Sequence, residues 1–226
     1  MADRARRFDD GTARALRGFG AAGIAAIVAI YLGNALFEPL SALLVLAWAW
    51  RSGTPWREIG FGRPRSWLLA IAGGVALGIA IKLLLKALIL PALGAPPVNA
   101  AFHYLVGNSA ALPGAIFLMV VGAGVGEEVL FRGFAFERLG KLIGESAGAK
   151  AAIVAITALW FGLEHIANQG TWGFLQGTIV GLVFGAIFAA TRNLWFLIAA
   201  HAAFDLTALA IIYLDLEREA AGLLLG

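Results

Sequence analysis

Long runs of apolar residues alternate along this chain with short polar segments, many of them basic. Several of these runs reach the roughly 20 residues that a helix needs to cross about 30 Å of hydrocarbon. Backbone polar groups in lipid must be satisfied within the chain, so such runs are helical. The pattern predicts an all-α fold, a polytopic transmembrane helical bundle of about seven to eight spans. Residues 1–226 are expected to form a single integral membrane domain.

The expected spans follow from where the apolar runs are interrupted. A single helix over residues 19–50 would extend about 48 Å, too long for one straight crossing, and Pro39 is a natural break. We therefore expect two helices in that region. The seven expected spans are residues 19–37, 40–50, 67–92, 112–136, 150–167, 172–190 and 194–214. An eighth span or a re-entrant segment is the alternative.

The distribution of basic residues predicts the topology. Arg residues are frequent in residues 1–18, which we interpret as a cytoplasmic arm, and again in residues 51–66. Residues 93–111 contain no Lys or Arg and are expected outside. The positive-inside rule therefore predicts an integral plasma (inner) membrane protein with a cytoplasmic N-terminus. Within the third span, Lys82 and Lys86 share one helical face; we expect Lys86 to snorkel and Lys82 to face the bundle.

Composition agrees with a membrane protein and excludes other classes. Hydrophobic residues make up 61% of the chain and charged residues 14%, against about 45–50% and about 25% in soluble domains. No cysteine is present, which excludes disulfides, thiol catalysis and cysteine-based metal sites. The net charge is +3, but no Lys/Arg-rich nucleic-acid segment occurs. The expected partners are membrane lipids and a substrate, with no nucleic acid, and the oligomeric state is left open.

Charged side chains lie inside the fourth expected span. At membrane depth each costs about 2.5–3.5 kcal/mol on insertion scales, so such residues usually have a function. Glu128 and Arg132 are four residues apart and can pair on one helical face. Glu127 is rotated by about 100° from Glu128, which leaves its carboxylate free for chemistry. A buried structural ion pair between helices is the alternative interpretation of this group.

Two later spans each carry a histidine. Phe161 and His165 are four residues apart, as are His201 and Asp205, so each pair shares a helical face. Depths counted along the helices bring both histidines near Glu127, between the cytoplasmic half and the middle of the membrane. A general base requires a carboxylate, and stabilisation of an oxyanion requires a hydrogen-bond donor; these residues supply both.

Three motifs together resemble a known family. Residues 127–132 read Glu-Glu-Val-Leu-Phe-Arg, residues 161–165 read Phe-Gly-Leu-Glu-His, and residues 201–205 read His-Ala-Ala-Phe-Asp. In this order, on three expected spans, they resemble the CAAX prenyl protease type II family, also called the CPBP or ABI family of CAAX proteases and bacteriocin-processing enzymes. The resemblance covers roughly residues 50–210. The Ala-, Gly- and Arg-rich composition is typical of a prokaryotic member.

The resemblance implies an intramembrane, glutamate-dependent endopeptidase whose catalytic cavity, between the helices that carry Glu127, His165 and His201, opens to the cytosol. It implies that Glu127 activates the attacking water, that His165 helps to hold this water, and that His201 and Asp205 stabilise the oxyanion. Glu128 and Arg132, with Phe161, would order the site. The implied substrate is a peptide or a lipidated protein, and no cofactor is expected.

Two residues depart from the usual family pattern. Asp205 stands where prenyl proteases often have Asn, and a carboxylate cannot donate a hydrogen bond unless it is protonated. Its alternative role is therefore to orient His201. Glu164, next to His165, adds a carboxylate where many family members are apolar, and the sequence assigns it no role.

Other functions stay open at this point. A non-catalytic membrane immunity or scaffold protein on the same fold could retain the polar residues for assembly. A zinc-dependent intramembrane protease is a second alternative, since two histidines and a carboxylate are a plausible zinc set, although no His-Glu-x-x-His occurs. An ion-coupled carrier is a third, but no internal repeat is evident.

Overall fold

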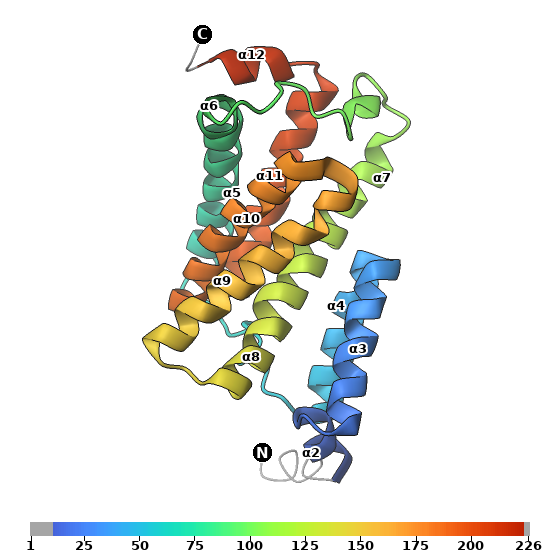
Figure 1. Cartoon of the computed structure of the whole chain (residues 1–226), viewed down its shortest axis with the longest axis vertical. Helices are drawn as coiled ribbons and strands as arrows, with labels where there is room; N and C mark the ends of the chain where they lie inside the picture. Colours follow the sequence, from blue (N-terminus) through green and yellow to red (C-terminus); the bar gives the residue numbers. More distant parts are fainter. Residues whose placement is uncertain (1–10, 224–226) are drawn as a thin grey trace.

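The computed structural model describes residues 11–223, and these residues form an all-helical bundle with no strand among them (Figure 1). The first helices are α2 (Gly11–Arg17), α3 (Ala21–Leu36) and α4 (Glu38–Ser52). Next come α5 (Trp67–Leu84), continued by the π-helical turn η1 (Leu85–Ile89) and α6 (Leu90–Ala92), and the 3₁₀ turn η2 (His103–Leu105). A long helix follows, composed of α7 (Leu112–Phe117), the π-helix η3 (Leu118–Ala135) and α8 (Phe136–Ile143). The last helices are α9 (Ala147–Glu164), α10 (Ile166–Thr191), α11 (Leu194–Tyr213) and α12 (Glu217–Gly222).

Five helices in the described part of the chain are long and apolar enough to cross a membrane. They are Trp67–Ala92, Leu112–Ile143, Ala147–Glu164, Ile166–Thr191 and Leu194–Tyr213. A sixth candidate arises if α2 and α3, which meet at 58°, count as one bent span. The count is lower than the sequence predicts because α3 and α4 have only 16 and 15 residues. Of the expected cytoplasmic arm, residues 1–10 lie outside the described residues.

Helices α3 and α4 form a hairpin whose tip lies near mid-height of the bundle (Figure 1). The two helices are separated at Phe37, whose backbone is extended. Pro39 was expected to be the break, but it lies in the first turn of α4, where proline costs no hydrogen bond. The hairpin therefore ends beside the middle of η3, a placement that the apolar run alone does not reveal.

The boundary between α9 and α10 also differs from the expectation. The residues 168–171 were expected to form an external turn, but they lie within α10, which bends at Gly170, where φ is +62°. The sharp end of α9 comes earlier, at His165, which is the C-terminal cap. His165 therefore lies at a junction between two helices and not inside a span.

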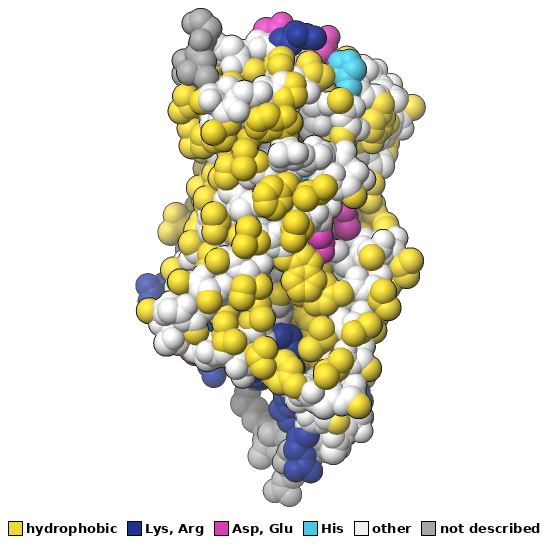
Figure 2. All heavy atoms as spheres, in the orientation of Figure 1, with side chains coloured by type: hydrophobic (Ala, Val, Ile, Leu, Met, Phe, Trp, Pro, Cys, Tyr) yellow, Lys and Arg dark blue, Asp and Glu magenta, His cyan; other side chains and the backbone are white. Residues whose placement is uncertain are grey.

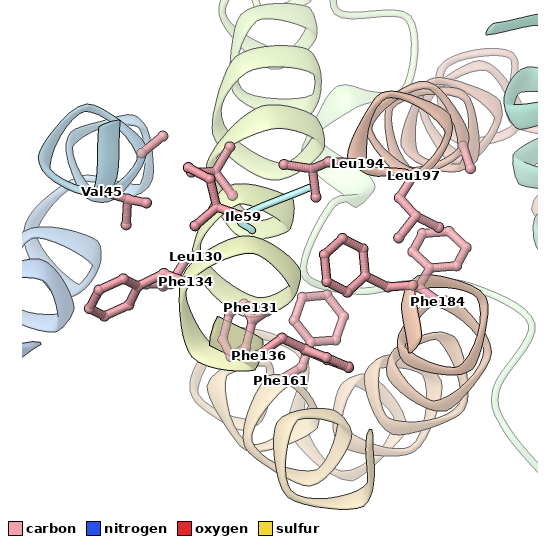
Figure 3. Close-up of a cluster of buried hydrophobic side chains, with 14 of the residues drawn as sticks. Val45, Ile59, Leu130, Phe131, Phe134, Phe136, Phe161, Phe184, Leu194 and Leu197 are labelled. Atoms are coloured by element: carbon pink, nitrogen blue, oxygen red, sulfur yellow. The ribbon is translucent and has the colours of Figure 1, made fainter. Parts of the chain in front are cut away.

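The main hydrophobic core surrounds η3 and is formed with residues of α4 and of the last three long helices. Phe131, Phe161 and Phe184, from η3, α9 and α10, point toward one another there (Figure 3). The glycines of α10 let it approach α9 closely, as their spacing predicts: a Cβ at Gly181 would lie 2.8 Å from the Cα of Ala158. Outside the core, the surface is largely hydrophobic through its middle, with Lys and Arg mostly toward the end that carries α2 and α8 (Figure 2).

Candidate active site

Helix η3 brings two carboxylates and a guanidinium into the core. Glu128 is fully buried and Arg132 is 1% exposed. Arg132 Nη1 donates a hydrogen bond to Glu128 Oε1 at 2.8 Å, as the four-residue spacing predicts. The guanidinium carbon also lies 4.8 Å from the ring centre of Phe161 and 5.6 Å from that of Phe184. Arg132 is thereby fixed by an ion pair on one side and aromatic rings around it.

His201 on α11 connects the carboxylates. Its Nδ1 donates a hydrogen bond to Glu128 Oε1 at 2.7 Å. Its Nε2 lies 3.5 Å from Glu127 Oε2 and 3.7 Å from Asp205 Oδ2. The sequence suggested Asp205 as the residue that orients His201, but it is Glu128 that accepts the hydrogen bond from Nδ1. Nε2 consequently faces the space between Glu127 and Asp205.

Glu127 differs from Glu128 in its partners. Its side chain is buried, at 7% exposure, and its Oε2 accepts no hydrogen bond from the described residues. Glu128 Oε1 is held by two donors, from Arg132 and His201. Glu128 is thus anchored through Oε1, although its Oε2, like Glu127 Oε2, has no hydrogen-bond partner among the described residues. An unpaired buried oxygen is costly unless a further donor such as water binds it.

His165 approaches the same group through Phe161. Its Nδ1 donates to the carbonyl oxygen of Phe161 at 2.8 Å, which leaves Nε2 with a lone pair in the neutral ring. The ring of His165 lies 4.7 Å from the ring of Phe161, and the ring of His201 lies 5.8 Å from it. Gly177 provides space, since a Cβ there would be 3.2 Å from His165 Nδ1.

A second polar cluster adjoins the site, and the sequence did not identify it. Glu164, for which the sequence gave no role, accepts a hydrogen bond from Asn34 Nδ2 at 3.0 Å and so joins α9 to α3. At the tip of the hairpin, Glu38 lies against η3, because a Cβ at Gly122 would be 2.7 Å from Glu38 Oε2. Glu38 interacts electrostatically with Asp205 and His201. In the sequence, this cluster is indicated only by Asn34 and Glu38, two polar residues within the apolar run of residues 19–50.

No group of three or more His, Cys, Asp or Glu side chains in residues 11–223 is arranged to hold a metal ion. Cavities of about 1130 Å³ and about 480 Å³ lie at opposite ends of the bundle. Neither is lined by Glu127, His165, His201 or Asp205. The cavity expected around these residues is therefore not one of the two.

The sequence was compared with known protein families, curated proteins and solved structures. Residues 109–207 match the family model described as Type II CAAX prenyl endopeptidase Rce1-like. Neither a curated protein nor a solved structure matches the chain. The matched residues contain all three motifs, although the match is narrower than the expected residues 50–210. Over residues 109–207, the chain is therefore similar to the Rce1-like type II CAAX prenyl endopeptidase family that its motifs indicate.

Proposed function

We propose that the protein is an intramembrane endopeptidase that hydrolyses a peptide bond with a water molecule activated by Glu127. The observation that carries this proposal is the position of His201 Nε2, within 4 Å of both Glu127 Oε2 and Asp205 Oδ2. A carboxylate without a hydrogen bond and an oriented imidazole thus face one buried point. The similarity to this family supports a protease of the CAAX type.

In the proposed reaction Glu127 accepts a proton from water, and the water oxygen attacks the carbonyl carbon of the scissile peptide bond. His165 Nε2 accepts the second hydrogen of the water and holds it in place. When His201 Nε2 carries a proton, its N–H donates to the oxyanion that forms. Glu127 then returns its proton to the leaving nitrogen as the C–N bond breaks. The products are a new carboxylate and a free amine.

Glu128, Arg132 and Phe161 are positioning residues in this proposal. Glu128 fixes the imidazole of His201 through Nδ1, and Arg132 keeps Glu128 in place. Phe161 contacts both imidazoles and the guanidinium. Held in this way, the imidazoles need little reorganisation during the reaction, which is where preorganised sites gain most of their rate.

We further propose that the protein resides in the plasma (inner) membrane, with its N-terminus and the opening of its catalytic cavity on the cytosolic side. The support is the positive charge at one end of the bundle, where Arg57, Arg63, Arg65 and Arg192 lie. The proposed substrate is a peptide or a lipidated protein, as the resemblance to prenyl proteases implies. We propose no resident cofactor.

The test is cleavage of a farnesylated CAAX peptide by the purified protein in detergent. Wild type is compared with Glu127→Gln and with Glu219→Gln, whose side chain is exposed on α12. We expect loss of cleavage only in Glu127→Gln, and no effect of a chelator. Loss of activity in the chelator would support a metalloenzyme. A wild type that cleaves neither this peptide nor a library of prenylated and unprenylated peptides would support a non-catalytic immunity or scaffold protein.

A further inference from the structure

Lys82 on α5 is a buried cation that the proposed mechanism does not use. The residue is 8% exposed. Its Nζ donates to Gln176 Oε1 at 3.2 Å and lies 4.8 Å from the ring centre of Phe204. No carboxylate in residues 11–223 forms an ion pair with it. An ammonium has three donors, and burying its charge beside one neutral acceptor is costly. An anion within reach of Nζ would accept its remaining donors.

The Lys82 side chain lines the cavity of about 480 Å³, a volume within the range of small-ligand sites. The other polar side chains of the lining include the amides of Gln169 and Gln176. Lys86 also lines it, but its charge is neutralised by Glu217 at 3.0 Å. Lys82 therefore supplies a positive charge in this cavity that no ion pair within residues 11–223 neutralises, although Asp205 and Glu217 act on it from a greater distance.

The cavity begins about one helical turn from the catalytic residues. Ala208 in its lining follows Asp205 by three residues, a rise of about 4.5 Å along α11. The backbone N–H of Gln169, also in the lining, donates to the carbonyl oxygen of His165 at 2.9 Å. Lys82 itself interacts electrostatically with Asp205. The lining of the cavity is thus adjacent in the chain to Asp205 on α11 and follows His165 on α10.

We infer that Lys82 binds the C-terminal carboxylate of the peptide substrate in this cavity, an inference that rests on the proposed function. The carboxylate supplies this anion and accepts the remaining donors of the ammonium. In this inference about three extended residues, a length of about 10 Å, lie between the scissile bond and Lys82. The side-chain amides of Gln169 and Gln176 can pair with the peptide groups of this segment. Lys82 would then restrict cleavage to bonds near a chain end.

The first experiment measures cleavage of two peptides that differ only in a free or amidated C-terminus. In wild type we expect the amide to show a KM about 10- to 100-fold higher, the range expected for loss of a hydrogen-bonded ion pair, with little change in kcat. Lys82→Gln should raise the KM of the free acid to that of the amide, and Lys82→Arg should restore most of the preference. Lys150→Gln, an exposed lysine at the other end of the bundle, is the matched control.

The second experiment measures binding without chemistry. A fluorescently labelled form of each peptide is titrated into Glu127→Gln and into the double variant Glu127→Gln/Lys82→Gln, and anisotropy is recorded. We expect Glu127→Gln to prefer the free acid and the double variant to bind both peptides equally. Inorganic phosphate and anionic lipid micelles serve as competitors, and displacement by either at the concentration of the peptide would indicate a general anion site and overturn the inference.

The two proposals fail in different ways. If wild type cleaves acid and amide equally, or if Lys82→Gln keeps the preference, the inference about Lys82 is wrong and the proposed function stands. If no peptide is cleaved, the proposed function is wrong, and the binding experiment alone decides whether Lys82 recognises a carboxylate. Equal or absent binding of the two peptides by Glu127→Gln would overturn the inference.

Discussion

Glu128 and His201 are 73 residues apart in the sequence, and their side chains are joined by a hydrogen bond of 2.7 Å. The same Glu128 oxygen accepts from Arg132 at 2.8 Å. One buried carboxylate oxygen thus determines the position of both a guanidinium and an imidazole, which come from η3 and α11. The carboxylate next to it in sequence, Glu127, is the one to which the proposed mechanism assigns the chemistry.

The first prediction concerns Glu128. In Glu128→Gln the buried Arg132 loses its counter-charge, and we expect a loss of stability of about 3–5 kcal/mol, as for other broken buried pairs. The double variant Glu128→Gln/Arg132→Gln should recover much of that stability, because no unpaired charge remains. Cleavage activity should stay low in both, since His201 Nδ1 has lost its anionic acceptor. Thermal unfolding and peptide cleavage measure the two effects. Recovery of activity in the double variant would contradict the orienting role.

A second prediction tests the shape of the cation at position 132. Lys in place of Arg keeps the charge but loses the planar group that lies over Phe161 and Phe184. We expect kcat of Arg132→Lys to fall by about 10-fold, because Glu128 is then held less firmly. The control is Arg218→Lys, an exposed arginine on α12. Equal activity of wild type and Arg132→Lys would show that a positive charge at position 132, without the planar guanidinium, is enough to hold Glu128.

The third prediction concerns the contact between α5 and α11. A Cβ at Gly78 would lie 2.0 Å from the backbone oxygen of Ala200, the residue before His201. Gly78→Ala should therefore force the helices apart, with an expected cost of about 1–3 kcal/mol in stability and a loss of activity. Gly148→Ala is the matched control, because nothing lies within 4 Å of a Cβ there. Both variants are compared by thermal unfolding, and similar melting temperatures would refute the close contact.

The fourth prediction concerns the hydrogen bond between Asn34 and Glu164. A double-mutant cycle with Asn34→Ala and Glu164→Ala should give a coupling energy of about 1–2 kcal/mol, the size expected for a partly buried hydrogen bond to a charged acceptor. The same cycle with Asn34 and the exposed Glu145 should give none. Zero coupling between Asn34 and Glu164 would mean that this bond does not hold α3 against α9.

The sequence predicts the local part of the site well, because helical geometry alone decides it. The pairs Glu128–Arg132, Phe161–His165 and His201–Asp205 are each four residues apart, and each pair is in contact. The all-α fold follows from the apolar runs in the same way. These predictions need only the helical repeat and no knowledge of how the helices pack.

The remaining features depend on tertiary packing. The hydrogen bond from His201 to Glu128 requires η3 and α11 to lie at one particular height relative to each other, which depths counted from uncertain helix ends cannot supply. The same holds for Glu38, which reaches η3 only because the hairpin of α3 and α4 ends at mid-height. The helix break at His165 depends on a helix cap that hydropathy does not record.

Because Glu127, Glu128 and Asp205 all lie beside the imidazole of His201, their effects on the reaction rate are not independent. Replacing Glu128 changes the ring that Glu127 faces, and replacing His201 removes a neighbour from Glu127, Glu128 and Asp205 together. Rate losses from single substitutions in this group should therefore sum to more than the loss in a combined variant. Any redesign of this catalytic group would have to change its members jointly.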